Sequence, residues 1–153
     1  MLQAHLAEFP VRQATREDLP EICSLIHAVR INPTGLDWRR FVVVVTPQRT
    51  LLGCGQIKAH ADGSRELASI AVQEHIRGQG VARAVIEALL AFEPERPLYL
   101  MCQARLKLLY AKFGFHAIGL EDMPPYFRRI SHVERVFNSK AQPGNRLMVM
   151  RLN

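Results

Sequence analysis

The chain has 153 residues, of which 48% are hydrophobic and 22% are charged. These proportions are those of a globular domain, and they exclude a disordered chain, a collagen-like repeat and a disulfide-stapled miniprotein. No apolar run approaches the ~20 residues of a membrane-spanning helix, and the charged N-terminal segment contains no secretory signal. We therefore expect a single domain over residues 1–153, located in the cytoplasm and not attached to a membrane.

The net charge of +6 belongs mainly to the C-terminal segment, since residues 126–153 contain six basic residues and one acidic residue. A solvated basic face is the simpler explanation, because no motif for recognising nucleic acid accompanies the charge. We do not expect a nucleic-acid partner. The cysteines, at positions 23, 54 and 102, are far apart and indicate reduced thiols. The histidines lack the spacing of a metal site, and we expect no metal.

The first half of the chain predicts a helix followed by three successive strands. Acidic residues after Thr15 suit the start of a helix, and apolar residues at intervals of three and four continue it to about Arg30. β-branched and apolar runs then predict strands, and Asp62-Gly63 favours a hairpin turn between the last two. These strands are expected at residues 41–45, 51–60 and 66–72.

The second half alternates helices with strands. A helix is predicted from Gly80 to Phe92, because Val81, Val85 and Leu89 fall on one face. Strands are expected at residues 98–102, 115–118 and 147–152, with a short helix at 105–112, while residues 126–137 are compatible with helix or strand. The order predicts a mixed α/β sheet with helices on both faces, and the three successive strands argue against a Rossmann fold.

The turn between the strand ending at Val72 and the helix starting near Gly80 is the most informative segment. Its glycines, Gly78 and Gly80, let the backbone curl and bring N–H groups against a ligand. The helix N-terminus adds free N–H donors and a positive dipole end, which suit a pyrophosphate, and Arg77 can add a charged contact. The turn is neither a Walker A loop nor a G-x-G-x-x-G fingerprint. Local physics alone equally allows a plain strand-to-helix turn.

Two motifs together resemble the GNAT superfamily of N-acetyltransferases. The segment Arg77-Gly78-Gln79-Gly80-Val81-Ala82 is similar to the family's R/Q-x-x-G-x-G/A acyl-CoA motif, and the strand before it resembles the family's preceding strand. Downstream, Leu109-Tyr110-Ala111-Lys112-Phe113-Gly114-Phe115 resembles the family's Y-x-x-x-G-F segment, at the expected distance. The resemblance covers the chain from about residue 10 to 120. It implies a mixed, mostly antiparallel sheet of six to seven strands with a splayed strand pair at the CoA site.

The resemblance also implies roles for individual residues. The main chain at Ile70, Ala71 and Val72 would pair with the pantetheine arm of acetyl-CoA. The pyrophosphate would lie on the turn formed by Arg77, Gly78, Gln79, Gly80, Val81 and Ala82. Many family members carry an asparagine seven residues before the tyrosine, and this residue contacts the cofactor arm. Here Gln103 stands at that position, and we expect it to contact the cofactor through an amide that is one methylene longer.

Two residues are the candidates for the chemistry. Tyr110 would be the general acid for the departing CoA thiolate, although a tyrosine at the end of a short helix is also a common structural feature. Glu66 would accept the proton of the acceptor amine, directly or through water, and the alternative is a solvated hairpin carboxylate beside Arg65. His60 and His75 are weaker candidates.

The resemblance predicts an acetyl-CoA-dependent N-acetyltransferase in which an amine attacks the thioester directly. The acceptor is a protein lysine or N-terminal amine, slightly favoured because Arg128 and Arg129 suit an acidic acceptor, or a small-molecule amine. A non-catalytic acyl-CoA-binding or regulatory domain on the same fold is the alternative. A homodimer is compatible with the sequence.

Overall fold

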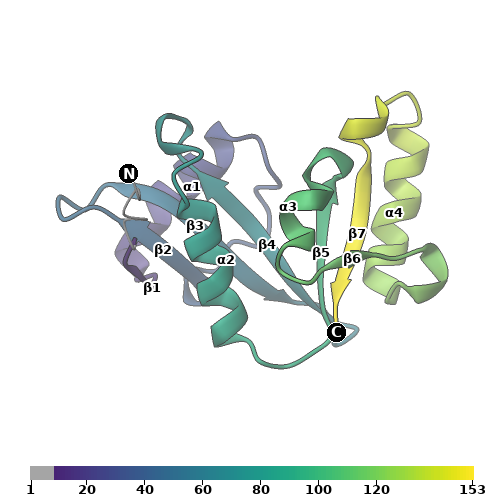
Figure 1. Ribbon diagram of the computed structural model, residues 1–153, viewed down its shortest axis with the longest axis horizontal. Helices are drawn as coiled ribbons and strands as arrows, with labels where there is room; N and C mark the ends of the chain where they lie inside the picture. The colour runs from purple at the N-terminus through teal and green to yellow at the C-terminus, as the bar shows by residue number, and fades with distance from the viewer. Residues whose placement is uncertain (1–8) are drawn as a thin grey trace, which may run out of the picture. The chain divides into compact units, whose positions relative to one another are not determined.

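The computed structural model describes residues 9–153, which group into two compact units. Within the described residues, unit 1 comprises residues 9–58 and Ala68–Pro94, and unit 2 comprises Ala59–Leu67 and Glu95–Asn153. One seven-stranded sheet has the strand order β1-β2-β3-β4-β5-β7-β6, and β4 runs through both units (Figure 1). Among the pairings described, β4 with β5 is parallel and the others are antiparallel. The mixed, mostly antiparallel sheet expected from the sequence is confirmed.

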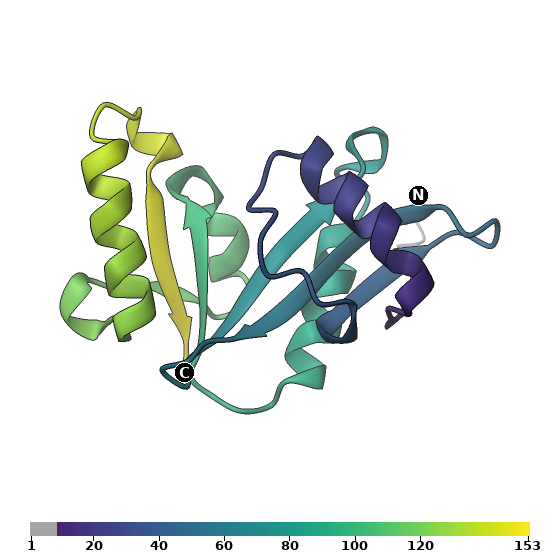
Figure 2. The same ribbon diagram turned by 180° about the vertical axis from the view of Figure 1, so that it is seen from behind.

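Unit 1 contains the predicted helix and strands of the first half of the chain. A short strand β1 precedes α1, and α2 follows β4. The helices α1 and α2 lie on opposite faces of the strands, as Figures 1 and 2 show. The elements are β1 (Val11–Gln13), α1 (Leu19–Ala28), β2 (Phe41–Val45), β3 (Leu51–Ala59), β4 (Arg65–Val72) and α2 (Val81–Phe92).

The start of α1 follows from its sequence. A 3-10 turn at Arg16–Asp18 leads into the helix, and the Asp18 carboxylate accepts a hydrogen bond from the Thr15 backbone N–H at 2.7 Å. The same carboxylate pairs with Arg12 at 2.7 Å. The helix then buries Ile22, an apolar residue of the predicted stripe, against the strands. Capping and amphipathic periodicity therefore agree at this helix.

The other face of unit 1 depends on two glycines in β3. A Cβ at Gly53 would lie 2.5 Å from Val81 Cγ1, and a Cβ at Gly55 would lie 2.7 Å from Val85 Cγ1. These distances are too short for real carbon contacts, so α2 can approach β3 this closely only because both positions lack a side chain. The two glycines thus allow the first two turns of α2 to pack closely against the sheet.

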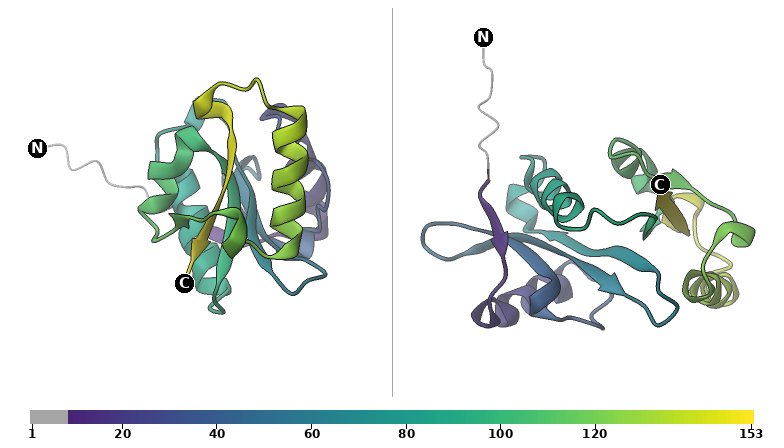
Figure 3. Two further views of the ribbon diagram at one scale, coloured as in Figure 1. Left: turned by 90° about the vertical axis from the view of Figure 1, so that its right-hand side faces the viewer. Right: turned by 90° about the horizontal axis from the view of Figure 1, so that it is seen from below.

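Unit 2 contains the remaining elements. Strands β5 and β7 pair along their whole length, and α3 and α4 lie on opposite sides of them (Figure 3). The predicted strand at residues 115–118 shortens to two residues, and the predicted helix at 105–112 begins with a 3-10 turn. The elements are β5 (Leu98–Gln103), α3 (Lys107–Ala111), β6 (His116–Ala117), α4 (Pro125–Phe137) and β7 (Leu147–Leu152).

Residues 126–137, which the sequence left compatible with helix or strand, lie in helix α4. Its residue Phe127 is fully buried, with its ring centroid 5.2 Å from that of Tyr99, and Val149 belongs to the same cluster. Val136 and Phe137 remain 73% and 80% exposed. Because these apolar residues do not face the core, the hydrophobic pattern of this segment could not identify a helix. None of the helices among the described residues is long and apolar enough to cross a bilayer.

Candidate acetyl-CoA site

In unit 1 the predicted phosphate turn leaves the sheet after Val72. Gln73 still donates its backbone N–H to the Leu52 carbonyl at 2.9 Å, and a single 3-10 turn, Glu74–Ile76, follows. Gly78 and Gly80 then adopt φ of +79° and +92°, in the left-handed region that glycine favours. A Cβ at either position would meet nothing within 4 Å. Both glycines are therefore required by the backbone conformation and not by packing, and the space beside them is open.

The open side of this turn presents backbone N–H groups. Gly80 caps α2 without a side-chain hydrogen bond, and the first bond of this turn runs from the Ala84 N–H to the Gly80 carbonyl at 3.0 Å. The N–H groups of residues 81–83 thus precede the first intrahelical bond. Within the described residues, the backbone N–H groups of residues 78–80 also have no protein acceptor. Free donors at the positive end of a twelve-residue helix, next to the exposed Arg77, fit a pyrophosphate.

The preceding strand has an interruption that the sequence did not reveal. Ser69 has φ of +59° in the middle of β4, a conformation unfavourable for a residue with a side chain. Its hydroxyl accepts a hydrogen bond from Gln56 Nε2 at 2.8 Å, and Gln56 is fully buried. The distortion lies directly before Ile70, Ala71 and Val72, the residues expected to pair with pantetheine. Such strain persists where surrounding contacts hold it, and it commonly marks a functional backbone.

In unit 2 Tyr110 lies in the last turn of α3 and is 8% exposed. Its ring contacts Phe115 edge-on, with centroids 6.4 Å apart. Burial, with a smaller effect of the nearby Cys102, raises the pKa of the phenol to about 12. The hydroxyl is therefore protonated throughout the physiological range, as a general acid must be. Gln103 lies at the end of β5, where its Oε1 accepts a hydrogen bond from Arg105 Nε at 2.7 Å.

Glu66 is not a solvated hairpin carboxylate. It is 6% exposed, and its Oε2 lies 3.2 Å from His60 Nε2. Arg65, the preceding residue in the chain, pairs with Glu95 at 3.1 Å. The ring of His60 stacks on that of Tyr126, with centroids 3.5 Å apart and planes 14° apart. From the sequence His60 is one of the weaker candidates, and no motif connects it with Tyr126.

The proximity of His60 and Glu66 had one signal in the sequence. The Asp62-Gly63 turn is a two-residue hairpin signal, and residues flanking such a turn lie near one another. The structure confirms a hairpin here, with a loop of three residues, 61–63: the His60 N–H donates to the Ser64 carbonyl at 2.9 Å, the Gly63 N–H donates to the His60 carbonyl at 3.0 Å, and Gly63 has φ of +87°. No local signal could have indicated Tyr126, which comes from α4.

The arginines of α4 have different surroundings. The Arg128 guanidinium donates to the carbonyls of Leu120 at 3.3 Å and Met123 at 3.1 Å, so it stabilises the loop that leads into the helix. Arg129 is exposed. The structure therefore gives Arg128 a local structural role, which weakens the argument that it was placed there for an acidic acceptor.

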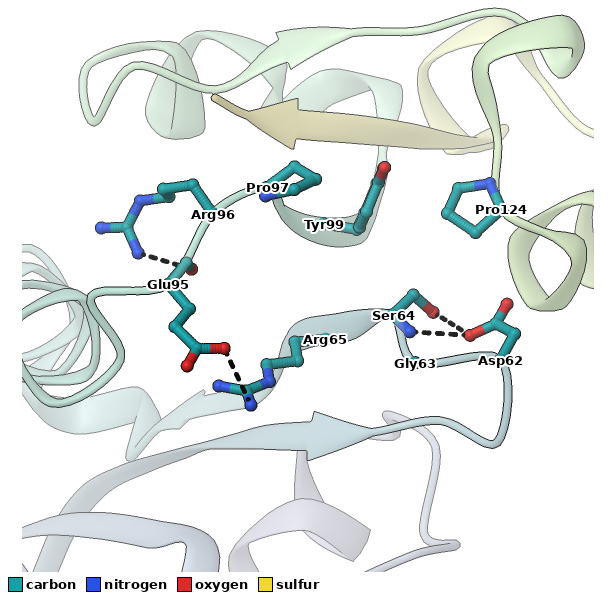
Figure 4. Close-up of a pocket in the computed structure, with 9 residues that line it drawn as sticks. All are labelled: Asp62, Gly63, Ser64, Arg65, Glu95, Arg96, Pro97, Tyr99 and Pro124. Atoms are coloured by element: carbon teal, nitrogen blue, oxygen red, sulfur yellow. Dashed lines mark hydrogen bonds and ion pairs between the residues drawn. The ribbon is translucent and has the colours of Figure 1, made fainter.

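A small pocket of about 270 Å³ in unit 2 contains none of the predicted site residues (Figure 4). Its polar groups bond to one another: Asp62 accepts from the Ser64 N–H at 2.8 Å, and Arg65 pairs with Glu95. Burial alone would raise the pKa of Asp62, but hydrogen bonds from Ser64 and the Tyr126 N–H lower it overall. Among residues 9–153 there is no group of three or more His, Cys, Asp or Glu side chains that could hold a metal ion.

Comparisons with known proteins agree with this geometry. The family model of the acetyltransferase (GNAT) domain matches residues 37–117, more than half of the chain. The crystal structure of Rv2747 from Mycobacterium tuberculosis, in complex with CoA, has a TM-score of 0.70 and 21% identity, and the match covers 94% of this chain and 98% of that one.

Other solved structures share the fold. N-acetylglutamate synthase from Neisseria gonorrhoeae, complexed with CoA and N-acetyl-glutamate, has a TM-score of 0.69 and 18% identity, with 94% of this chain and 35% of that chain covered. Escherichia coli ElaA has a TM-score of 0.66 and 16% identity, with 94% and 99% covered. No curated protein matches the sequence significantly. The match to the family model shows that the chain belongs to the GNAT acetyltransferases, enzymes that take the acetyl group from acetyl-CoA.

Proposed function

We propose that this protein is an N-acetyltransferase in which a primary amine attacks the thioester of acetyl-CoA directly. The observation that carries the proposal is the open turn before α2, with its free backbone N–H groups at residues 78–83. Acetyl-CoA supplies the activated acyl group, and the turn supplies donors for its pyrophosphate. We assign these contacts to Arg77, Gly78, Gln79, Gly80, Val81 and Ala82, and we propose one acetyltransferase domain spanning both units.

The main chain of Ile70, Ala71 and Val72 is our candidate for the pantetheine contact. Its support is the positive φ of Ser69, which interrupts the regular strand just before these residues. An interrupted strand leaves N–H and C=O groups available for an extended ligand arm. Gln103 is the weaker candidate, because the hydrogen bond that its Oε1 accepts from Arg105 already orients its amide.

Tyr110 is our candidate for the general acid. When the tetrahedral intermediate collapses, the departing thiolate takes a proton, and a buried phenol with a pKa of about 12 carries that proton at neutral pH. Glu66 is our candidate for the base, since an amine must lose a proton before its lone pair can attack. Its carboxylate is buried and lies beside His60.

The acceptor is a primary amine of a small molecule, a peptide or a protein. N-acetylglutamate synthase, a structural neighbour, was solved with N-acetyl-glutamate, so amino acids belong in any acceptor panel. The free Cys23, Cys54 and Cys102 support a reducing compartment such as the cytoplasm.

The experiment measures thiol release from acetyl-CoA in the presence of amino acids, polyamines, and peptides with a lysine or a free N-terminus. Wild type is compared with Tyr110→Phe, and CoA affinity is measured separately by calorimetry. Acceptor-dependent thiol release that falls roughly 10²-fold or more in Tyr110→Phe, with CoA affinity unchanged, supports the proposal. CoA binding without turnover on any acceptor supports a non-catalytic acyl-CoA-binding domain instead.

A further inference from the structure

We propose that His60 is the positioning residue of the catalytic base, holding the Glu66 carboxylate ionised and oriented while Tyr126 of α4 holds the His60 ring. The inference rests on the proposed function, because it assigns a partner to the base of that reaction. It also assigns a purpose to α4, a segment for which the sequence offered no motif.

The contacts form a chain from α4 to the carboxylate. The backbone N–H of Tyr126 donates to Asp62 Oδ2 at 2.9 Å, which anchors the start of α4 to the hairpin turn. The Tyr126 ring covers one face of His60 at a centroid distance of 3.5 Å, and Phe127 approaches with its edge at 5.7 Å. The imidazole is thereby held with Nε2 3.2 Å from Glu66 Oε2.

Both members of this pair lie away from solvent. The side chains of His60 and Glu66 are 11% and 8% exposed. A carboxylate at this depth is costly to keep charged unless hydrogen bonds to its oxygens replace the lost water. An N–H at His60 Nε2 supplies such a bond, and the aromatic stack restricts the ring rotations that would break it.

Charged and titratable groups near the pair come from several elements: β3 contributes Lys58, two residues before His60 and 8% exposed, and β7 contributes Arg151, whose backbone is paired with that of Tyr99. The hairpin contributes Asp62, α4 contributes Tyr126 with Arg129 nearby, and β5 contributes Tyr99, whose backbone is paired with that of Glu66. Burial, followed by the Glu66 charge, raises the pKa of Tyr126. The Tyr126 phenol is therefore neutral at physiological pH, and its ring acts on His60 through stacking.

The role in the reaction follows from the proton balance. The ammonium of the acceptor gives one proton to a Glu66 oxygen, and its nitrogen lone pair then attacks the acetyl carbon. This transfer requires Glu66 to be ionised beforehand, which the His60 N–H favours by donating to the charged form. His60 makes no contact with the reacting atoms in this scheme and acts through Glu66.

Two substitutions separate the hydrogen bond from the stack. His60→Phe keeps an aromatic ring against Tyr126 and removes the N–H, whereas His60→Gln keeps an amide N–H within reach of Glu66 and removes the ring. His132→Gln, at an exposed histidine of α4, is the matched control. Thermal unfolding of each variant verifies that the chain folds.

We expect His60→Phe to lower kcat roughly 10- to 100-fold, the effect of one hydrogen bond to a charged group. The acid limb of its pH–rate profile moves to higher pH, because the loss of one hydrogen-bond donor favours the protonated form of a carboxyl group. The KM for acetyl-CoA is unchanged, and His60→Gln retains most of the activity. A purely structural role predicts the reverse order of the two variants. The proposal would be overturned if His60→Phe kept the wild-type kcat and the wild-type acid limb of the pH–rate profile.

A measurement independent of turnover separates this proposal from the proposed function. The ¹⁵N chemical shifts of His60 report which ring nitrogen carries the proton. We expect the proton on Nε2 in wild type and a changed tautomer ratio in Glu66→Gln. If no amine is acetylated, the proposed function fails, and these shifts decide whether His60 positions Glu66. Identical shifts in wild type and Glu66→Gln would count against the pair whether or not the enzyme turns over.

Discussion

Replacing Gly80 by alanine tests the phosphate turn through its backbone alone. Gly80 has φ of +92° as the residue that caps α2, and an added Cβ would meet nothing within 4 Å. The substitution therefore introduces no collision, and its cost is the strain of a side chain in the left-handed region, about 1–2 kcal/mol. For a chain of this size that corresponds to a fall of roughly 2–8 °C in the unfolding midpoint.

The effect on binding is larger if the turn holds the pyrophosphate. A turn that relaxes to relieve the strain rotates N–H groups away from the ligand, and each lost hydrogen bond to a charged group is worth about 1.5–3 kcal/mol. We therefore expect the Kd of Gly80→Ala for CoA to rise roughly 10- to 150-fold. Isothermal titration calorimetry with CoA measures the affinity, and differential scanning calorimetry measures the stability.

Gly63→Ala is the matched control for this experiment. Gly63 has φ of +87° in the hairpin turn, and an added Cβ would again meet nothing within 4 Å. The same backbone strain should lower its stability by a similar amount and leave the CoA affinity unchanged. If Gly80→Ala binds CoA as tightly as wild type, or if Gly63→Ala weakens binding equally, the turn does not bind the pyrophosphate as we argue.

The remaining predictions concern packing, protonation and thiol reactivity. Gly55→Ala should lower stability by about 1–3 kcal/mol in urea unfolding, because its Cβ would collide with the Val85 side chain, and a wild-type midpoint would contradict the close approach of α2. Tyr110 has a folded-state pKa of about 12, above the usual ~10, so the stability that it contributes is complete below pH 10 and declines as the pH rises towards 12. Unfolding midpoints measured from pH 8 to 11 should show this decline in the wild type and lack it in Tyr110→Phe. Burial raises the pKa of Cys54 to about 12 and of Cys102 to about 11, so a thiol reagent at pH 8 should modify only the exposed Cys23 in the folded protein and all three thiols after denaturation; rapid reaction of a second thiol would show that the core opens.

The turn at residues 77–82 could be recognised from sequence because the GNAT motif that it resembles is local. A strand, two glycines and the start of a helix follow one another between Ile70 and Ala82, and each depends on neighbouring residues. The positive φ angles of Gly78 and Gly80 agree with the expectation that these glycines let the backbone curl. The Tyr110 segment was recognised in the same way, from a short spacing within one element and the loop after it.

Other features depend on contacts between distant residues. The purpose of Gly53 and Gly55 became clear only from the position of α2, since a glycine in a strand can equally mark a bulge or a bend. The positive φ of Ser69 had no signal in its residue type, because the bond from the buried Gln56 helps to hold it.

By itself the sequence determined the order of the elements, the sheet class, the turn that we assign to acetyl-CoA and the identity of the candidate acid and base. The order and the sheet class follow from periodicity, capping and turn chemistry, which act over a few residues, whereas the turn, the acid and the base follow from the resemblance to the GNAT superfamily. Only the tertiary structure decided that α4 is a helix, that Glu66 is buried and that His60 lies between Glu66 and Tyr126. Burial and stacking result from packing segments that are distant in the sequence, as His60 and Tyr126 are, and no local pattern records which partner a side chain will meet.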